Sequence, residues 1–243
     1  MAQNFPKVGK LSESDSLYFR KVKSDNFQKV LLFSENFLIF KAMKPKILLY
    51  TDSYYHIYNH AVGKESLFLS NENYLFFLNK YSYYIHPIAK TFAYCLLPNH
   101  LHILLKIRSV DTLMQIEHIN DYENYHLYIS KQFSNLFSSY TQAFNKKYNR
   151  MGNLFISNFK RKLIETDSYF AQLLYYIHIN PIHHSITKNI TEWQYSSYQS
   201  FTKDSNTKLE KDEVINWFGN KSDFIEYHKQ RLGMDKIEEI EYL

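Results

Sequence analysis

The chain of 243 residues contains a single cysteine, Cys95, which lies within the apolar stretch FAYCLL. One cysteine excludes a disulfide framework within the chain and a metal site built from several cysteine ligands. Proteins without disulfides are typical of reducing compartments. We therefore expect a cytoplasmic protein.

Long hydrophobic runs are also missing. The sequence has no stretch of about 18 uncharged apolar residues, the length that a membrane-spanning helix needs. The first 20 residues alternate polar and charged groups, so the apolar core of a signal peptide is absent there. We expect no membrane partner and no export. A hydrophobic content of 45% with 18% aromatic residues is nevertheless sufficient for a globular core.

Acidic residues are absent between residues 125 and 164, although the net charge of the whole chain is only +5. The segment instead carries seven cations: Lys131, Lys146, Lys147, Arg150, Lys160, Arg161 and Lys162. Such an excess indicates either a solvated basic face or a surface that binds a polyanion. We predict that the last six of these cations bind nucleic acid.

Aromatic residues are interleaved with these cations: Phe133, Phe137, Tyr140, Phe144, Tyr148, Phe155 and Phe159. Unpaired bases need stacking partners as well as cations. The combination therefore favours a single-stranded nucleic acid as the partner.

The hydrophobic periodicity predicts an α+β fold, in which an antiparallel sheet carries helices on one face and leaves the other face open. The expected strands are a first strand ending near residue 59, then residues 88–97 and 100–107, and the expected helices are residues 71–81, 125–148 and 168–180, with a weaker helix from 111. Gly63 marks a turn, and Pro98-Asn99 joins the second and third strands into a hairpin. Thr166-Asp167 is a good cap for the last helix, which Pro181 should end.

Two histidines occur in the stretch PNHLHILL, at positions 100 and 102. Side chains alternate along a strand, so His100 and His102 point to the same face. Two imidazoles in that arrangement can converge on one divalent cation. The same spacing also occurs among structural histidines, so spacing alone leaves both interpretations open.

Tyr176 and Asn180 lie four residues apart in LLYYIHINP and share one face of the last helix. An Asn oxygen can ligate Mg²⁺ or Mn²⁺, and the tyrosine would then stand beside the ion. Alternatively, Tyr176 is a core residue and Asn180 caps the helix.

The ordered set LPNHLHILL, GNLFISNFKRKLI and DSYFAQLLYYIHINP resembles the single-tyrosine HUH transposases, and especially the REP-associated tyrosine transposases of bacteria. YHIYNHAVGKESLF, NENYLFFL and EWQYSSYQSF extend the resemblance. It covers residues 46–202. The ordered combination is far more specific than an isolated pair of histidines.

The resemblance implies a ferredoxin-like fold in which His100 and His102 form the HUH motif, Asn180 is the third ligand of Mg²⁺ or Mn²⁺ and Tyr176 is the nucleophile. It implies a monomeric or homodimeric enzyme that cleaves and rejoins single-stranded hairpin DNA through a 5′-phosphotyrosine intermediate. A domesticated DNA-binding protein that no longer cuts, or a replication or mobilisation nickase, are the alternatives.

The same pattern divides the chain into an N-terminal extension of unassigned role (residues 1–45), the HUH domain (46–183) and a C-terminal helical extension (184–243). We expect a hinge near residues 158–166 that lets the tyrosine helix move. His56 is expected to be structural, and His183 and His184 are expected to lie at the surface.

Overall fold

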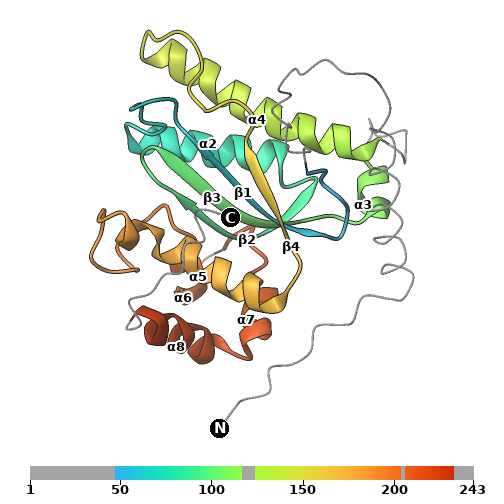
Figure 1. The fold of residues 1–243 in the computed structure, drawn as a ribbon, viewed down its shortest axis with the longest axis vertical. Helices are drawn as coiled ribbons and strands as arrows, with labels where there is room; N and C mark the ends of the chain where they lie inside the picture. Colours follow the sequence, from blue (N-terminus) through green and yellow to red (C-terminus); the bar gives the residue numbers. More distant parts are fainter. Residues whose placement is uncertain (1–46, 117–123, 204–205, 233–243) are drawn as a thin grey trace, which may run out of the picture. The chain divides into compact units, whose positions relative to one another are not determined.

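The computed structural model describes residues 47–116, 124–203 and 206–232 (Figure 1). The elements are β1 (Tyr54–His60), α2 (Asn71–Tyr84), β2 (Ala89–Leu96), β3 (His100–Ile107), α3 (Val110–Met114), α4 (Tyr125–Lys147), β4 (Lys160–Ile164), α5 (Asp167–His183), α6 (Tyr198–Thr202), α7 (Lys211–Phe218) and α8 (Lys221–Leu232). The N-terminal extension predicted over residues 1–45 lies outside the described residues.

The four strands form one sheet in the order β2-β3-β1-β4, and every neighbouring pair is antiparallel. Together with α2 and α4 they follow the order βαββαβ, which is the ferredoxin-like arrangement. The predicted α+β class and the antiparallel hairpin of β2 and β3 are confirmed. The two histidines of the HxH pair lie on β3, an inner strand of the sheet, as predicted.

Alternation along β3 separates two hydrophobic clusters. Leu101, Ile103 and Leu105 belong to the cluster that α2 and α4 cover, whereas Leu104 belongs to the cluster on the opposite face. That second face was expected to stay open. Instead α5 packs across β2 and β3 there, and the helices lie on both sides of the sheet (Figure 1).

The aromatic residues of the basic segment lie in the core, so the prediction that they stack on bases was wrong. Six of them are buried: Phe133, Phe137, Tyr140, Phe144, Phe155 and Phe159. The four on α4 recur at intervals of three or four residues, which is the spacing of one helix face that packs on a sheet. Tyr148 is partly buried against the same cluster.

The structure confirms the predicted start of α5 but not its predicted end. The Thr166 side chain accepts a hydrogen bond from the backbone N–H of Tyr169 at 3.2 Å, which confirms the predicted cap. Pro181 does not end the helix, because α5 continues to His183. A proline so close to the end removes a single backbone donor, and the last turn still forms.

The segment before α5 is not a free hinge. Residues Lys160–Ile164 form β4, which pairs with β1 along its whole length. The hydrogen bonds of this pairing hold residues 160–164 to the sheet, so the part of the predicted hinge that falls on β4 is not free to move. The rest of the predicted hinge, residues 158–159 and 165–166, lies outside the strand.

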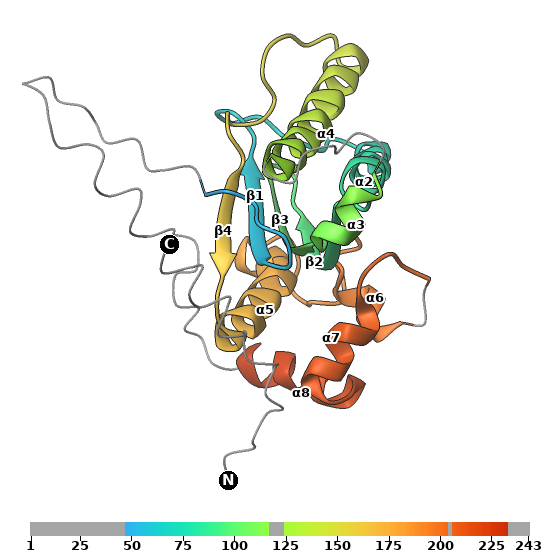
Figure 2. The ribbon, with the colours of Figure 1, turned by 90° about the vertical axis from the view of Figure 1, so that its right-hand side faces the viewer.

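Three short helices, α6, α7 and α8, gather beside α5 at the end of the molecule away from α4 (Figure 2). Val214, Phe218 and Phe224 contribute buried side chains to the cluster that also contains Leu174 and Ile177 of α5. The domain boundary after residue 183 stays a prediction, although this shared cluster shows that the described C-terminal helices have no separate core. None of the described helices is long and apolar enough to cross a membrane.

Candidate active site

The site lies between the sheet and α5, where β3 and α5 face each other. His100 Nε2 lies 3.2 Å from Asn180 Oδ1, and the rings of His102 and Tyr176 have centroids 5.4 Å apart. All four side chains are buried. The structure therefore brings together the two histidines, the tyrosine and the asparagine that the sequence singles out.

His56 holds His102 in place. The β1–β3 register puts Tyr58 opposite His102, and His56 Nε2 reaches His102 Nδ1 at 2.9 Å. Burial, with a smaller effect of Lys162, lowers the pKa of His56 to about 3. A neutral imidazole that bonds the far nitrogen of a ligand histidine fixes the orientation of that ligand. His56 is thus structural, as predicted, but its contact is with the site itself.

The other nitrogen of His102, Nε2, is buried and has no hydrogen-bond partner within the described ranges. Burial, followed by the neighbouring histidines, holds the pKa of His102 well below its usual range. The ring is therefore neutral at pH 7. A neutral imidazole with one nitrogen already bonded can offer the second one to a metal ion without first losing a proton.

His100 faces an oxygen atom at each of its ring nitrogens. Nδ1 lies 2.8 Å from Asn99 Oδ1, and Nε2 lies 3.2 Å from Asn180 Oδ1. Burial lowers the pKa of His100 to about 3, so the ring carries only one proton and can donate to only one of these oxygens.

Three arrangements remove this conflict at His100: a rotated Asn99 amide, a rotated Asn180 amide, or a cation between Nε2 and the Asn180 Oδ1. Adjacent ligands of an octahedral ion with bonds of about 2.0–2.1 Å lie about 3 Å apart, close to the observed spacing. The Asn180 amide nitrogen is likewise buried without a partner among the residues that the structure describes. The donor set of two imidazoles and one amide oxygen therefore fits a divalent cation.

A cluster of three or more His, Cys, Asp or Glu side chains suited to a metal is not found in the described part of the chain. The candidate set contains only two such residues, because its third member is the amide of Asn180. Any metal site here therefore needs the Asn oxygen, water or substrate to complete it.

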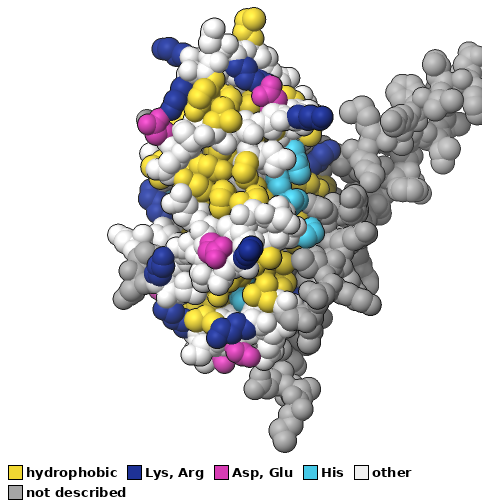
Figure 3. Space-filling view, turned by 90° about the vertical axis from the view of Figure 1, so that its left-hand side faces the viewer, with side chains coloured by type: hydrophobic (Ala, Val, Ile, Leu, Met, Phe, Trp, Pro, Cys, Tyr) yellow, Lys and Arg dark blue, Asp and Glu magenta, His cyan; other side chains and the backbone are white. Residues whose placement is uncertain are grey.

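Three further histidines, His60, His183 and His184, lie beside the site. His60 stacks on His100 with ring centroids 4.8 Å apart, His184 lies 4.5 Å from His100, and His183 lies 6.4 Å from Tyr176. His183 and His184 are exposed, as predicted, and Figure 3 shows histidine side chains grouped on one face of the surface. Their spacing of seven and four residues after Tyr176 and Asn180 could have placed them beside the site.

Two of the six predicted nucleic-acid-binding cations face the site. Lys160 and Lys162 pair with Tyr58 and His56 across the β1–β4 register, and paired residues share a face of the sheet. Lys162 Nζ lies 4.7 Å from the centroid of the Tyr169 ring on α5. These lysines therefore continue the site along the edge strand.

The remaining predicted cations lie elsewhere or have acidic partners. Arg161 points to the α4 side, where it donates to Ser130 Oγ at 3.2 Å. Lys147 forms an ion pair with Glu72, and Arg150 forms one with Glu65. The six cations were expected to act together, but the structure distributes them over three locations: the edge of the site (Lys160, Lys162), the α4 face (Arg161) and the end of α4 with its following loop (Lys146, Lys147, Arg150).

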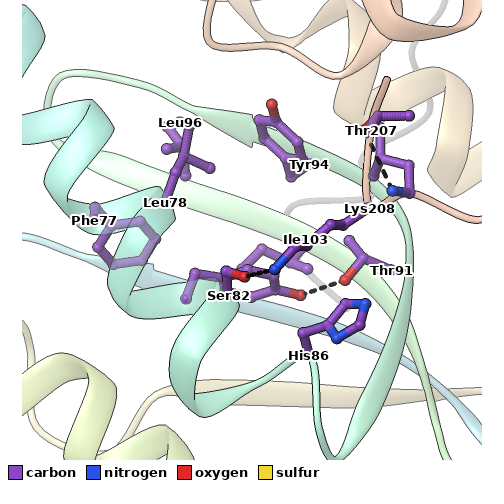
Figure 4. A pocket seen from close by; sticks show the side chains of 12 residues that line it. Phe77, Leu78, Ser82, His86, Thr91, Tyr94, Leu96, Ile103, Thr207 and Lys208 are labelled. Atoms are coloured by element: carbon purple, nitrogen blue, oxygen red, sulfur yellow. Dashed lines mark hydrogen bonds between the residues drawn. The ribbon is translucent and has the colours of Figure 1, made fainter. Parts of the chain in front are cut away.

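A separate cavity of about 190 Å³ lies on the α2 side of the sheet. Its walls include Phe77 and Ile103, and Lys208 bonds Ser82 at its edge (Figure 4). None of the predicted site residues lines it. Because Ile103 and the two β3 histidines point to opposite faces, this cavity is not part of the candidate site.

No protein-family model matches the chain. A curated protein of Haemophilus influenzae named "Putative REP-associated tyrosine transposase" is 30% identical over 124 residues, which are 49% of this chain and 64% of that protein. The chain therefore spans less than two thirds of the relative that it matches. A solved structure described as "Structure of the REP associates tyrosine transposase bound to a REP hairpin" has a TM-score of 0.48 and 17% identity, over 66% of this chain and 85% of that one. The identity to the Haemophilus influenzae protein confirms the predicted resemblance to the REP-associated tyrosine transposases.

Proposed function

We propose that the chain is a metal-dependent transposase or endonuclease that cleaves and rejoins single-stranded hairpin DNA through a 5′-phosphotyrosine intermediate. The observation that carries this proposal is the placement of Tyr176 against His102, with Asn180 beside His100. The similarity to a protein named as a tyrosine transposase supports the same class of chemistry.

His100, His102 and Asn180 would hold the ion, which we propose to be Mg²⁺ or Mn²⁺. A bound divalent cation would withdraw charge from the non-bridging oxygens of a phosphodiester. The protein contributes the neutral imidazoles, the fixed orientation of His102 through His56 and the packing of α5 against the strand that carries both histidines. These features keep the ligand atoms in place before the substrate arrives.

Tyr176 would attack the phosphorus atom of the scissile phosphodiester. Its phenolic oxygen forms a new bond to phosphorus and the phenol gives up its proton. The bond from phosphorus to the 3′ oxygen breaks, and that oxygen takes up a proton and leaves as a 3′-hydroxyl. Because the phosphotyrosine ester retains the bond energy, attack by a 3′-hydroxyl reverses the step without a further energy source. One residue can therefore both cut and rejoin.

Lys160 and Lys162 would bind backbone phosphates next to the scissile group. They lie on the same face of the sheet as His56, at its open edge. Phosphate contacts position the strand without selecting its sequence. Selection of a hairpin would depend on its shape and its unpaired bases.

Covalent capture tests the proposal. The wild-type chain, incubated with Mn²⁺ and a panel of single-stranded hairpin oligonucleotides labelled 3′ of the cleavage site, should retain label after denaturation. Tyr176→Phe should abolish capture while the dissociation constant for the hairpin stays unchanged.

Tyr175→Phe is the matched control, because Tyr175 is the neighbouring tyrosine, lies about 100° around the helix axis from Tyr176, and packs against Tyr227 and His228. It should capture DNA as the wild type does. Binding without capture by the wild-type chain would support the non-cleaving DNA-binding alternative, and capture by Tyr176→Phe would refute the assignment of the nucleophile.

A further inference from the structure

A series of buried hydrogen bonds lies behind α5, on the side of the helix away from Tyr176. His178 follows Tyr176 by two residues, which turns its side chain about 200° around the helix axis. His178 Nδ1 lies 3.0 Å from His228 Nε2, and His178 Nε2 lies 2.9 Å from Ser197 Oγ. All three of these polar side chains are buried among apolar residues.

The partners fix the direction of every bond in this series. His228 Nδ1 lies 2.8 Å from the Phe224 carbonyl oxygen, which can only accept, so Nδ1 carries the proton. His228 Nε2 then accepts from His178 Nδ1. The remaining nitrogen of His178 accepts from the Ser197 hydroxyl, whose oxygen accepts from the backbone N–H of Tyr94 at 2.9 Å.

This assignment requires both imidazoles to be neutral, and their surroundings agree. Burial lowers the pKa of His228 to about 4 and holds the pKa of His178 well below its usual range. Each ring nitrogen and the serine hydroxyl then has one partner of the correct type. We call this series the histidine network; it consists of Ser197, His178 and His228, with Tyr94 and Phe224 contributing backbone groups.

The histidine network connects four elements. Tyr94 lies on β2, Ser197 immediately precedes α6, His178 lies on α5, and His228 lies on α8. The Ser197 N–H also donates to the Tyr94 carbonyl at 2.9 Å, so the serine is fixed to the sheet from both of its polar groups. The histidine network therefore joins the helix that carries Tyr176 both to the sheet that carries the two site histidines and to the C-terminal helix.

Apolar packing alone would permit small rotations and shifts of α5, because it has no directional requirement. Hydrogen bonds weaken steeply when their angles change, and a buried polar network that is fully paired selects one arrangement. Rotation of α5 that moved Tyr176 or Asn180 away from the sheet histidines would also separate His178 from its partners. The histidine network thus opposes the rotation of α5 that would misalign the site.

We propose that His178 and His228 are positioning residues, through which α8 sets the rotation of α5 and so the placement of Tyr176 and Asn180. This inference rests on the proposed function. It assigns the C-terminal extension a role in the reaction, because α8 supplies His228 to the histidine network.

The test compares three variants in which residue 228 or its neighbour is changed. His228→Phe removes the acceptor for His178. His228→Gln keeps an acceptor oxygen near the position of Nε2, and Lys229→Ala changes an exposed residue next to it. The single-turnover rate of hairpin cleavage and the hairpin dissociation constant are measured at a temperature where circular dichroism shows each variant to be folded.

His228→Phe should lower the cleavage rate by about 10- to 100-fold with an unchanged dissociation constant, since a misplacement of about 1 Å can cost that much. His228→Gln should recover most of the rate, and Lys229→Ala should match the wild type. A purely structural role would lower rate and binding together, in proportion to the unfolded fraction. Equal rates for His228→Phe and Lys229→Ala would overturn the proposal.

Two further measurements keep the outcome decisive. If His228→Phe does not fold, Ser197→Ala is a smaller change that removes the hydroxyl at the opposite end of the histidine network. It should give the same loss of rate at unchanged binding. If the wild-type chain does not cleave, the proposed function fails, and amide hydrogen exchange then decides the inference. Faster exchange at residues 176–180 in His228→Phe than in Lys229→Ala would support the positioning role of the histidine network, and equal exchange would refute that role.

Discussion

At the scale of single residues, His102 has one ring nitrogen fixed and the other available. Nδ1 lies 2.9 Å from His56 Nε2, whereas Nε2 is buried without a hydrogen-bond partner in the described residues. A buried polar atom without a partner costs about 1–3 kcal/mol. An occupant that accepts the Nε2 lone pair would therefore stabilise the fold as well as serve the chemistry.

Mn²⁺ affinity should decrease in a graded way when these histidines are replaced. His56→Leu removes an outer partner and should weaken binding about 10- to 100-fold. His102→Leu removes a ligand, so it should weaken binding further. His86→Leu, whose side chain lines the separate cavity, should have no effect. Isothermal titration with Mn²⁺ measures the series, and equal affinities for the His102 and His86 variants would contradict the proposed ligand set.

The sequence could predict which residues share a face but not which strands place them opposite each other. Strand and helix periodicity, with the family resemblance, sufficed for His100, His102, Tyr176 and Asn180. The contact of His56 with His102 depends on the β1–β3 register, which joins residues 46 positions apart. No local pattern in the sequence specifies that register.

At the scale of elements, β4 places two lysines at the edge of the candidate site. It is an edge strand, so its lysines on the site face are reachable from solvent, while Arg161 faces α4. Burial lowers the pKa of Lys162, whose side chain is partly exposed. The edge position thus supplies positive charge beside otherwise neutral histidines.

The salt dependence of DNA binding should identify the lysines that contact phosphates. Lys160→Ala and Lys162→Ala should each reduce the slope of log affinity against log salt by about 0.7, the value for one single-strand phosphate. Lys229→Ala on α8 should leave the slope unchanged. Binding of a labelled hairpin measured between low and physiological salt provides the test. An unchanged slope in both β4 variants would exclude them as phosphate contacts.

Element boundaries were predictable where the local signals were strong and failed where tertiary contacts decided. The strand 100–107 was predicted as observed, because a clear hydrophobic run starts directly after Pro98-Asn99. The role of residues 158–166 was missed, since a short basic segment becomes a strand only by pairing with β1. The continuation of α5 beyond Pro181 was missed because a proline near the end of a helix removes only one backbone donor, so the last turn still forms.

At the scale of the whole molecule, five buried histidines couple stability to pH. They are His56, His100, His102, His178 and His228, and burial lowers the pKa of each below the ordinary value of 6.5. The unfolded chain therefore binds more protons than the folded chain between pH 6.5 and the lowered values. Their contribution is complete above pH 6.5 and is lost as the pH falls through that range.

Stability should consequently decrease between pH 7 and pH 5.5. Each fully buried neutral histidine costs up to about 1.4 kcal/mol at one pH unit below its unfolded pKa. Urea unfolding in the presence of EDTA measures the effect, and His228→Phe should show a shallower decrease because it has one such group fewer. A stability that does not change over this interval would contradict the burial of these neutral histidines.

The measurement that tests the central claim most directly is mass spectrometry of the covalent protein–DNA adduct. After nuclease and protease digestion, the remaining 5′-nucleotide should be found on the peptide that contains Tyr176, and only when Mg²⁺ or Mn²⁺ was present. Because the chain contains 22 tyrosines, this assignment is discriminating. A nucleotide attached to a different tyrosine, or an adduct that forms equally well in EDTA, would contradict the account.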